Sequence, residues 1–465
     1  MSSIHLWIRR ARNAPDDHRL IARGMALVAL FVFIGKVAGA AKEMTVAWRY
    51  GVSDQVDAYL FVFNLVMWPV ALWLSVLMVV LLPFAARVRR DASLELPRFR
   101  SELFGLTLLL GAMLSLLALL GLPPLLRSSW AGLRPETIQS ATAMAPILIL
   151  TIPLGLVVGL FSAWMLAAGR HANTLLEGVP ATVLLIALVA FRGGQTQPLV
   201  WGTVVGFALH LLSLAVPLSR SGQIDYPKFT RQSPLWRAFW QSLGITVIGQ
   251  ALMSVVVVAD QFFAAHLGTG AIATLSYANR ILGLILGLGA TAVTRSTLPV
   301  FSEAEVESRT KLRSIATHWV RILFVVGVLA ACAGWFFAPI GVKLLFQRGA
   351  FTANDSDAVT KILRYGLAQL PFYFAGLVMV SMVVSQRRYA VIAIIGGVNL
   401  LTKVAANFLL TPYFGVSGLM ISTSAMLAGS CGLLSLAVFR TRSDRIILVD
   451  DAETIAAIPP GDIRH

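Results

Sequence analysis

Runs of about twenty apolar residues, separated by short polar stretches, recur along the whole chain. An α-helix of that length spans the hydrocarbon core of a bilayer, so the pattern predicts a polytopic helical membrane protein without a large soluble domain. The first run is longer than the core of a signal peptide and has no cleavage pattern, so we expect it to be a true span. We expect twelve spans, at residues 22–47, 56–86, 103–126, 141–168, 172–191, 199–219, 238–266, 271–300, 317–345, 357–384, 389–411 and 414–439.

Lysine and arginine are unevenly distributed among the connections between these spans. Connections after odd-numbered spans are poor in them, whereas those after the second, sixth and eighth spans are basic. Because basic loops are retained in the cytoplasm, this pattern predicts that both termini are cytoplasmic. The connection between the ninth and tenth spans does not fit, since Lys343, Arg348, Lys361 and Arg364 lie on the predicted outer side.

The two halves of the chain repeat the same spacings. Pro135 lies 18 residues before Pro153, and Ala353 lies 18 residues before Pro371. Six spans per half is an even number, so both halves have one orientation, which is the parallel repeat found in transporters with a central cavity. The expected fold is therefore all-α, with two pseudo-symmetric six-helix lobes. The expected boundaries are a basic N-terminal segment at 1–21, an N-lobe at 22–220, a cytoplasmic linker at 221–237, a C-lobe at 238–440 and a polar cytoplasmic tail at 441–465.

Composition supports this fold and narrows the function. Hydrophobic residues make up 57% of the 465 residues, charged residues make up 13%, and the mean hydropathy is +0.78. The net charge of +16 follows from basic cytoplasmic loops and does not indicate nucleic acid binding. The sequence has no nucleotide-binding glycine loop, nucleophile elbow or metal-binding His/Cys spacing. We therefore expect a transporter rather than an enzyme, with no cofactor and no metal.

The most informative ionisable residues lie in the first span. Lys36 interrupts an apolar run, and a charge at that depth costs roughly 2.5–3.5 kcal/mol unless it has a partner, water or a ligand. Glu43 is seven residues further on and shares the helix face of Lys36, while Lys42 points about 120° away. One interpretation is a cavity wall that receives an anionic group. The alternative is that Lys42 extends to the outer interface and pairs with Glu43 or Asp57.

Other expected spans also carry charges. Arg280 lies about ten residues into the eighth span, where a guanidinium can bind phosphate or form a structural salt bridge with Asp260. Arg295 lies nearer the cytoplasmic end and is expected to line the inner mouth. Asp57 begins the second span, where an aspartate can also be a helix cap.

A polar stripe marks the eleventh expected span. Lys403 lies in its middle, and Asn399 and Asn407 flank it at four residues on either side. Such a stripe faces protein or water rather than lipid, so these residues are further cavity candidates. Lys36, Arg280 and Lys403 are all cations, and a cavity lined in this way favours an anionic substrate.

Three stretches of the sequence resemble the MurJ/MviN lipid II flippase family, which belongs to the multidrug/oligosaccharidyl-lipid/polysaccharide exporter superfamily. The first two family helices are similar to GKVAGAAKEMTVAWRYGVSDQVDAYLFVFNL at residues 35–65. The seventh and eighth are similar to DQFFAAHLGTGAIATLSYANRILGLILG at residues 260–287. A loop-to-helix segment resembles LFQRGAFTANDSD at residues 345–357. The resemblance implies two lobes that work by alternating access in a bacterial inner membrane.

The resemblance also assigns residues. The family's first-helix arginines correspond to Lys36 and Lys42, and the neighbouring aspartate to Glu43. Its second-helix aspartate corresponds to Asp57, and its eighth-helix arginine to Arg280. The sequence departs from the family near residue 70, where a second-helix arginine is absent, and after residue 440, where we expect a polar tail rather than two further helices. Both departures leave open whether the substrate is lipid II or an exopolysaccharide repeat unit.

We therefore expect a flippase for a polyprenyl-diphosphate-linked glycan. In this hypothesis the diphosphate binds Lys36, Lys42 and Arg280, while acidic residues compete for these cations and help release the anion. The acidic candidates are Glu43, Asp57 and Asp260. The alternatives are an ion-coupled exporter of cationic drugs and a non-transporting scaffold of a glycan-assembly complex. Membrane lipid, a coupling ion and glycan-assembly proteins are the further candidate partners, and nucleic acid is not expected.

Overall fold

The computed structural model describes residues 34–91, 95–167, 176–191, 196–222, 224–386 and 388–439. Within these ranges the chain forms α-helices and one short 3-10 helix, and it contains no β-strand. Helices satisfy every backbone hydrogen bond within one segment, which lipid requires because it offers no partner to a free N–H or C=O group. The predicted all-α membrane fold is thereby confirmed.

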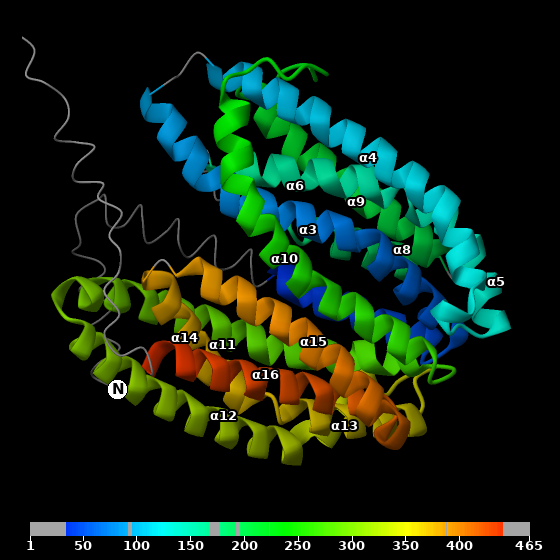
Figure 1. Ribbon diagram of the computed structural model, residues 1–465. Coiled ribbons are helices and arrows are strands. Elements are labelled where there is room, and N and C mark those ends of the chain that lie inside the picture. The colour runs from blue at the N-terminus through cyan, green and yellow to red at the C-terminus, as the bar shows by residue number, and fades with distance from the viewer. Residues whose placement is uncertain are drawn as a thin grey trace, which may run out of the picture.

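The first half of the chain begins with a helix over residues 34–50. The elements that follow are α3 (Asp54–Asp91), α4 (Glu95–Arg127), η1 (Ser129–Ala131), α5 (Pro135–Leu148), α6 (Thr151–Ala167), α8 (Val179–Ala190) and α9 (Gln197–Arg220). Helix α3 packs against α5 and α6, α6 packs against α4 and α9, and α8 packs against α9. These contacts make the first half one bundle (Figure 1).

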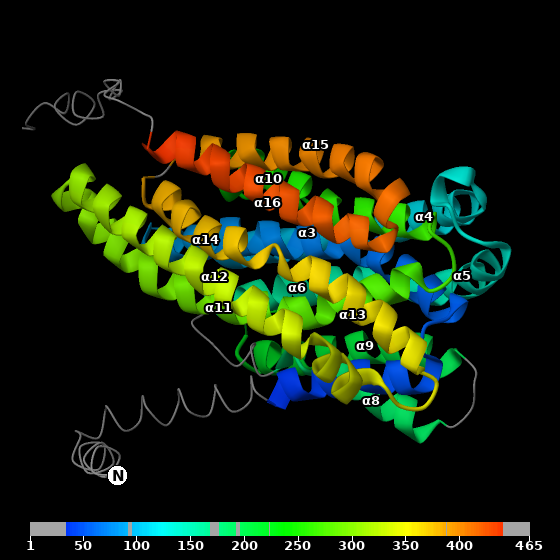
Figure 2. The same cartoon turned by 90° about the horizontal axis from the view of Figure 1, so that it is seen from below.

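The second half forms a second bundle. Its helices are α10 (Leu235–Ala265), α11 (Ala271–Glu307), α12 (Arg309–Phe346), α13 (Ala353–Leu367), α14 (Leu370–Ser385), α15 (Tyr389–Phe414) and α16 (Val416–Phe439). Helix α14 contacts α11, α12 and α16, while α15 contacts α10 and α16. Helix α10 also contacts α3, so it lies where the two bundles meet (Figure 1). The long helices of both bundles run in roughly the same direction (Figure 2).

The same bend occurs in both halves. Helices α5 and α6 meet at 47°, and α13 and α14 meet at 42°. Pro153 and Pro371 stand at the start of the second helix of each pair, where a missing N–H and a bulky ring interrupt a continuous helix. A glycine from the preceding long helix packs on each proline: a Cβ on Gly111 would lie 3.1 Å from the Pro153 Cα, and one on Gly327 would lie 2.5 Å from the Pro371 Cα. The repeat predicted from the spacings is visible as a matching bend and a matching contact.

The fold class does not by itself fix the number of spans. Among the described residues, seven helices are long and apolar enough to cross a membrane alone, and the two bent pairs raise the number to nine. The first helix is described only from residue 34, α8 has 12 residues, and the apolar part of α10 covers Ser254–Ala265. Twelve spans therefore stay a prediction, as do the lobe boundaries.

The basic stretch that did not fit the predicted topology is mostly helical. Lys343 lies in the last turn of α12, and Lys361 and Arg364 lie on α13, so the connection itself covers only residues 347–352. The Arg364 Nε donates to the Trp335 carbonyl oxygen at 3.1 Å, and its guanidinium lies 5.2 Å from the centre of the Trp335 ring. This arginine thus fastens α13 to α12.

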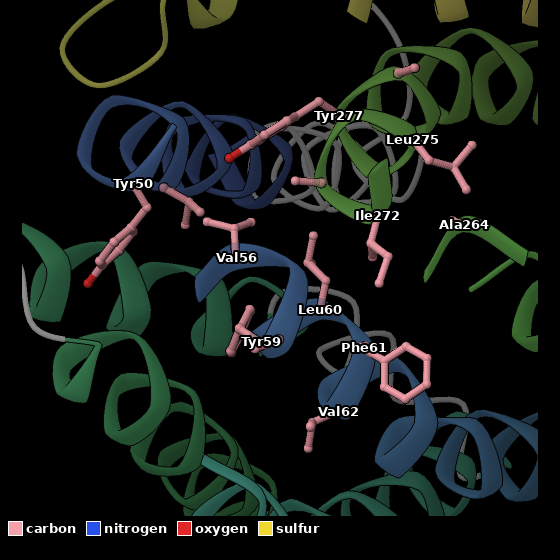
Figure 3. Packing of buried hydrophobic residues seen from close by; sticks show 14 of the residues in the cluster. Tyr50, Val56, Tyr59, Leu60, Phe61, Val62, Ala264, Ile272, Leu275 and Tyr277 are labelled. Carbon is pink, nitrogen blue, oxygen red and sulfur yellow. The ribbon is translucent and has the colours of Figure 1, made fainter. Parts of the chain in front are cut away.

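A hydrophobic core runs across the contact between the two bundles. Val56 and Leu60 of α3 point toward the start of α11, where Ile272 and Tyr277 lie (Figure 3). All four side chains are buried. Each Å² of apolar surface removed from water contributes roughly 25 cal/mol. The burial of these side chains therefore stabilises the contact between the halves at this end.

Candidate functional site

A cavity of about 470 Å³ lies between the helix over residues 34–50, the start of α8 and the first turns of α11. Three cations line it, namely Lys36, Lys42 and Arg280. Two carboxylates, Glu43 and Glu177, line it as well. The structure therefore gathers into one cavity the three cations that the sequence predicted to act together, with a formal excess of one positive charge.

Two glycine features shape this cavity. A Cβ on Gly178 would lie 2.8 Å from the Cα of Gly35, so the first helix can cross the start of α8 this closely only because both positions are glycine. Gly39 has no atom within 4 Å of its Cβ position and also lines the cavity. The contact between Gly35 and Gly178 thus brings the first helix and the start of α8 together. Gly39, one turn later, has no side chain to fill the cavity between them.

Glu43 lies between two of the cations. Its Oε1 is 2.6 Å from the Lys42 Nζ and 3.0 Å from the Arg280 Nε. Of the Glu43 side chain 15% is exposed, whereas 46% of the Arg280 side chain is exposed. A guanidinium has five N–H donors, so Arg280 can present its outer edge to a ligand while its Nε stays on Glu43.

The salt bridge between Arg280 and Asp260, which was the alternative to phosphate binding, is absent from the described residues. Arg280 on α11 pairs with Glu43 on the first helix, and this ion pair joins the two bundles. Asp260 on α10 pairs with Lys403 on α15 instead, at 3.0 Å. Asp260 is therefore not a cavity carboxylate, which corrects the sequence-based expectation.

Asp57 is also outside the cavity. Its side chain is 2% exposed, its Oδ2 accepts from the Gly270 N–H and its Oδ1 accepts from the Ala273 N–H, both at 2.6 Å. These N–H groups open helix α11, so Asp57 caps a helix of the other bundle. The alternative of a helix cap was right in kind, but the capped helix belongs to the opposite half.

Further contacts join the halves beside Asp57. The Tyr277 hydroxyl donates to the Gly51 carbonyl oxygen at 3.1 Å, and the Ala350 N–H donates to the Trp48 carbonyl oxygen at 2.8 Å. Gly51 has a φ of +59°, and a Cβ there would overlap the Ala350 carbonyl oxygen. We call the contacts made by Trp48, Gly51 and Asp57 the outer seam, because the topology predicted from the basic residues places this end on the outer side. It begins about one turn beyond Glu43 on the first helix, so the two halves are joined at that end of the cavity.

The polar stripe of α15 forms a separate buried cluster. The Lys403 Nζ donates to the Leu419 carbonyl oxygen at 2.7 Å and to the Thr423 Oγ1 at 2.6 Å. The Asn407 Nδ2 donates to the Asp260 Oδ1 at 2.9 Å. Lys403 and Asn407 are fully buried. They bind α10, α15 and α16 together instead of lining the cavity.

The remaining candidates of the sequence analysis also lie elsewhere. Asn399 is buried and accepts a hydrogen bond from Ser430 of α16. Its stripe therefore faces neighbouring helices, as expected, because α15 packs on α10 and α16. None of the described residues that line the cavity belongs to α15. The side chain of Arg295 lies outside the described part of the chain.

Two cavity residues escaped prediction from the sequence. Glu177 and Asn279 both line the cavity. Glu177 precedes α8 and looked like an ordinary helix-start residue, and its position depends on the crossing of Gly35 and Gly178. Asn279 directly precedes Arg280, so the prediction of Arg280 as a cavity residue was the only sign in the sequence that Asn279 lies there too.

Comparison with known proteins gives consistent matches. A family model described as "Lipid II flippase MurJ" matches residues 46–457. The "Probable lipid II flippase MurJ" of Buchnera aphidicola subsp. Baizongia pistaciae is 20% identical over 362 residues, covering 76% of this chain and 71% of the relative. The "Lipid II flippase MurJ" of Burkholderia cenocepacia is 24% identical over 442 residues, covering 90% and 83%.

Solved structures share the fold. A lipid II flippase MurJ in an inward closed conformation superposes with a TM-score of 0.75 at 18% identity, covering 89% of this chain and 87% of that one. An inward-facing multidrug resistance transporter of the MATE family, in the MOP superfamily, gives a TM-score of 0.70 at 16% identity, covering 88% and 96%. Both likenesses support two lobes of membrane helices.

Proposed function

Since this chain belongs to the MurJ family of lipid II flippases, we propose that its cationic cavity binds the diphosphate of a polyprenyl-diphosphate-linked glycan precursor. The protein is a multi-pass inner-membrane flippase for a lipid-linked precursor. Alternating access carries the head group from the inner to the outer leaflet, while the polyprenyl tail stays in lipid. Lipid II is the precursor named for the family and the curated relatives, and an exopolysaccharide repeat unit has the same diphosphate chemistry.

The observation that carries this proposal is the single Glu43 oxygen shared by Lys42 and Arg280. Two opposite charges about 4 Å apart attract by roughly 4 kcal/mol at the effective dielectric of a protein surface. A diphosphate that displaces Glu43 exchanges one anion for another, so the cations are never left unpaired. Release then follows when Glu43 returns, and the carboxylate acts as an internal competitor.

The acidic residues argue against export of cationic drugs. Such an exporter needs a central carboxylate that is available to the cargo. Among the described residues, cations outnumber carboxylates in the cavity by three to two, and Glu43 is held by Lys42 and Arg280. Asp260 pairs with Lys403, and Asp57 caps α11. In the same proposal both termini face the cytoplasm, the protein carries no catalytic activity of its own, and an ion gradient or consumption of the product drives transport.

The test is replacement of Arg280. Losing charge-assisted hydrogen bonds of about 1.5–3 kcal/mol should lower precursor flux roughly 10- to 100-fold in Arg280→Ala. Arg280→Lys should keep part of the flux because it keeps the positive charge. The rest should be lost because lysine lacks the forked N–H donors of arginine. Flux is measured as the fraction of newly made lipid-linked precursor that reaches the outer leaflet of cells depending on this protein.

Arg127→Ala is the matched control, since Arg127 is exposed at the end of α4 and does not line the cavity. Equal flux in the two alanine variants would refute the binding role of Arg280. Restored growth without any precursor crossing the membrane would instead support a scaffold.

A further inference from the structure

The segment that joins the two halves is fixed to α4 by one buried carboxylate. Residues 224–233 form no regular secondary structure. Glu102 of α4 accepts hydrogen bonds from the Thr230 Oγ1 at 2.8 Å, the Gln232 N–H at 3.0 Å and the Ser233 N–H at 3.1 Å. The Trp236 Nε1, at the start of α10, donates to the same carboxylate at 2.6 Å. Four donors on a side chain that is fully buried hold the linker in one place.

A second set of contacts fixes the middle of the linker. The Lys228 N–H donates to the Ser101 carbonyl oxygen at 3.0 Å, and the Ser101 hydroxyl donates to the Tyr226 carbonyl oxygen. A Cβ on Gly105 would overlap the Lys228 carbonyl oxygen, so the linker backbone lies directly on α4.

Two aromatic side chains of this fixed linker project into solvent. Tyr226 is 91% exposed and Phe229 is 64% exposed. The side chains of Lys228 and Arg231 are exposed between and beside them. We call these four residues the linker surface. Its aromatic and cationic side chains alternate, and the acid in the same segment, Asp225, lies 3.9 Å from the Arg100 guanidinium.

The linker surface lies at the level where membrane-crossing helices end. The linker follows α9, which ends at Arg220, and precedes α10, which begins at Leu235. It rests on the first turns of α4, whose apolar stretch begins at Leu96. Two helices that are long and apolar enough to cross a membrane, α4 and α9, therefore flank it, and the distribution of basic residues predicts that this is the cytoplasmic side.

We propose that the linker surface is an interfacial anchor that binds anionic phospholipid head groups of the cytoplasmic leaflet. Aromatic rings concentrate at the boundary between hydrocarbon and head groups, and basic side chains near an anionic leaflet are attracted to it. Protein–protein interfaces are also enriched in aromatic residues and arginine, so the position of the linker surface decides for lipid. It lies beside the ends of the membrane-crossing helices α4 and α9, and each ring is followed two residues later by a cation. The rigid backbone means that binding costs little ordering of the linker.

The first test measures lipid affinity. The purified full-length chain is titrated with phosphatidylglycerol or phosphatidylcholine, and affinity is taken from the rise of its unfolding midpoint. Lys228→Gln/Arg231→Gln should bind phosphatidylglycerol about 30-fold more weakly than the unaltered chain, with little change for phosphatidylcholine. The control Arg127→Gln/Lys343→Gln removes the same charge from exposed positions at the opposite end. An equal loss in the control would overturn the proposal, because net charge alone would then explain binding.

The second test measures where the rings lie. Tyr226→Cys and Phe229→Cys are made singly in a Cys332→Ser/Cys431→Ser background. Each new cysteine is labelled with an environment-sensitive dye, and the protein is placed in proteoliposomes. In phosphatidylglycerol vesicles we expect quenching by lipids brominated near the head group and protection from aqueous iodide. Equal quenching by iodide in both kinds of vesicle would place the linker surface in water and overturn the anchor. Protection of the dye that requires an added soluble protein would overturn it as well.

Discussion

Replacing Asp57 by asparagine should loosen the outer seam without unfolding the protein. The Asp57 carboxylate receives two backbone N–H groups from the start of α11, and both bonds cross from one half to the other. Separating the two halves at this end would break both bonds. Asp57→Asn therefore removes stabilisation from the closed state alone, which shifts the balance toward an outward-open state.

The size of this shift follows from the geometry. A hydrogen bond to a charged partner contributes about 1.5–3 kcal/mol, and a neutral one contributes about 1 kcal/mol. Asparagine keeps one accepting oxygen and turns its NH₂ group toward the second N–H donor, so one bond is lost and the other is weakened. We expect a loss of about 2–5 kcal/mol from the closed state. That corresponds to a change of roughly 30- to 5,000-fold in the equilibrium between the two states.

Asp54 provides the matched control. It is the same residue type, one turn earlier on α3, and its Oδ1 accepts from the Thr137 Oγ1 at 2.7 Å. Thr137 lies on α5, in the same half. Asp54→Asn thus weakens a carboxylate bond near the seam without touching a contact between the halves.

The assay is the rate of cysteine modification from outside the cell. Ser276→Cys in a Cys332→Ser/Cys431→Ser background places a thiol in a small pocket between α11 and α3, near Tyr59. A membrane-impermeant maleimide should react much faster after Asp57→Asn is added, and no faster after Asp54→Asn. An unchanged rate in Asp57→Asn, or an equal increase in both variants, would refute the seam as a latch.

Two further substitutions test the packing of the second half. Lys403→Met leaves Asp260 as an uncompensated buried charge and should destabilise the fold by about 3–5 kcal/mol. Adding Asp260→Leu should recover most of that stability, and unfolding in detergent that shows no recovery would contradict the pairing. Gly327→Ala places a Cβ 2.5 Å from the Pro371 Cα and should cost about 1–3 kcal/mol. Gly341→Ala on the same helix meets open space and should be neutral or stabilising by up to about 1 kcal/mol, so equal unfolding midpoints would count against the bend contact.

The sequence predicted the features that depend on local spacing. Apolar runs of bilayer length predicted the helices, because lipid leaves a single chain segment no other way to pair its backbone. The matching spacings of the prolines at 153 and 371 predicted the repeat, and each one stands in the first turn of its helix, where proline is tolerated. Lys36 and Glu43 reach one cavity because seven residues make nearly two turns of helix.

Pairings between distant segments were beyond the sequence. Asp57 and Gly270 are 213 residues apart, and Asn407 and Asp260 are 147 apart. Which carboxylate meets which cation depends on the rotation of each helix about its axis. A buried charge shows that a partner is required, but not which one it is.

Glu43 and Asp57 hold the same two halves of the chain together by different means. Glu43 ties the first helix to α11 through Arg280, and Asp57 ties α3 to the first turn of α11 through backbone N–H groups. A diphosphate that displaces Glu43 removes the first tie, so the halves are then joined by the seam and by the apolar contacts between them. Bound substrate and Asp57→Asn should therefore act in the same direction, and the loaded protein should open outward more readily than the empty one. Because Glu43 regains its cations only when the anion leaves, the same exchange favours closing again after release.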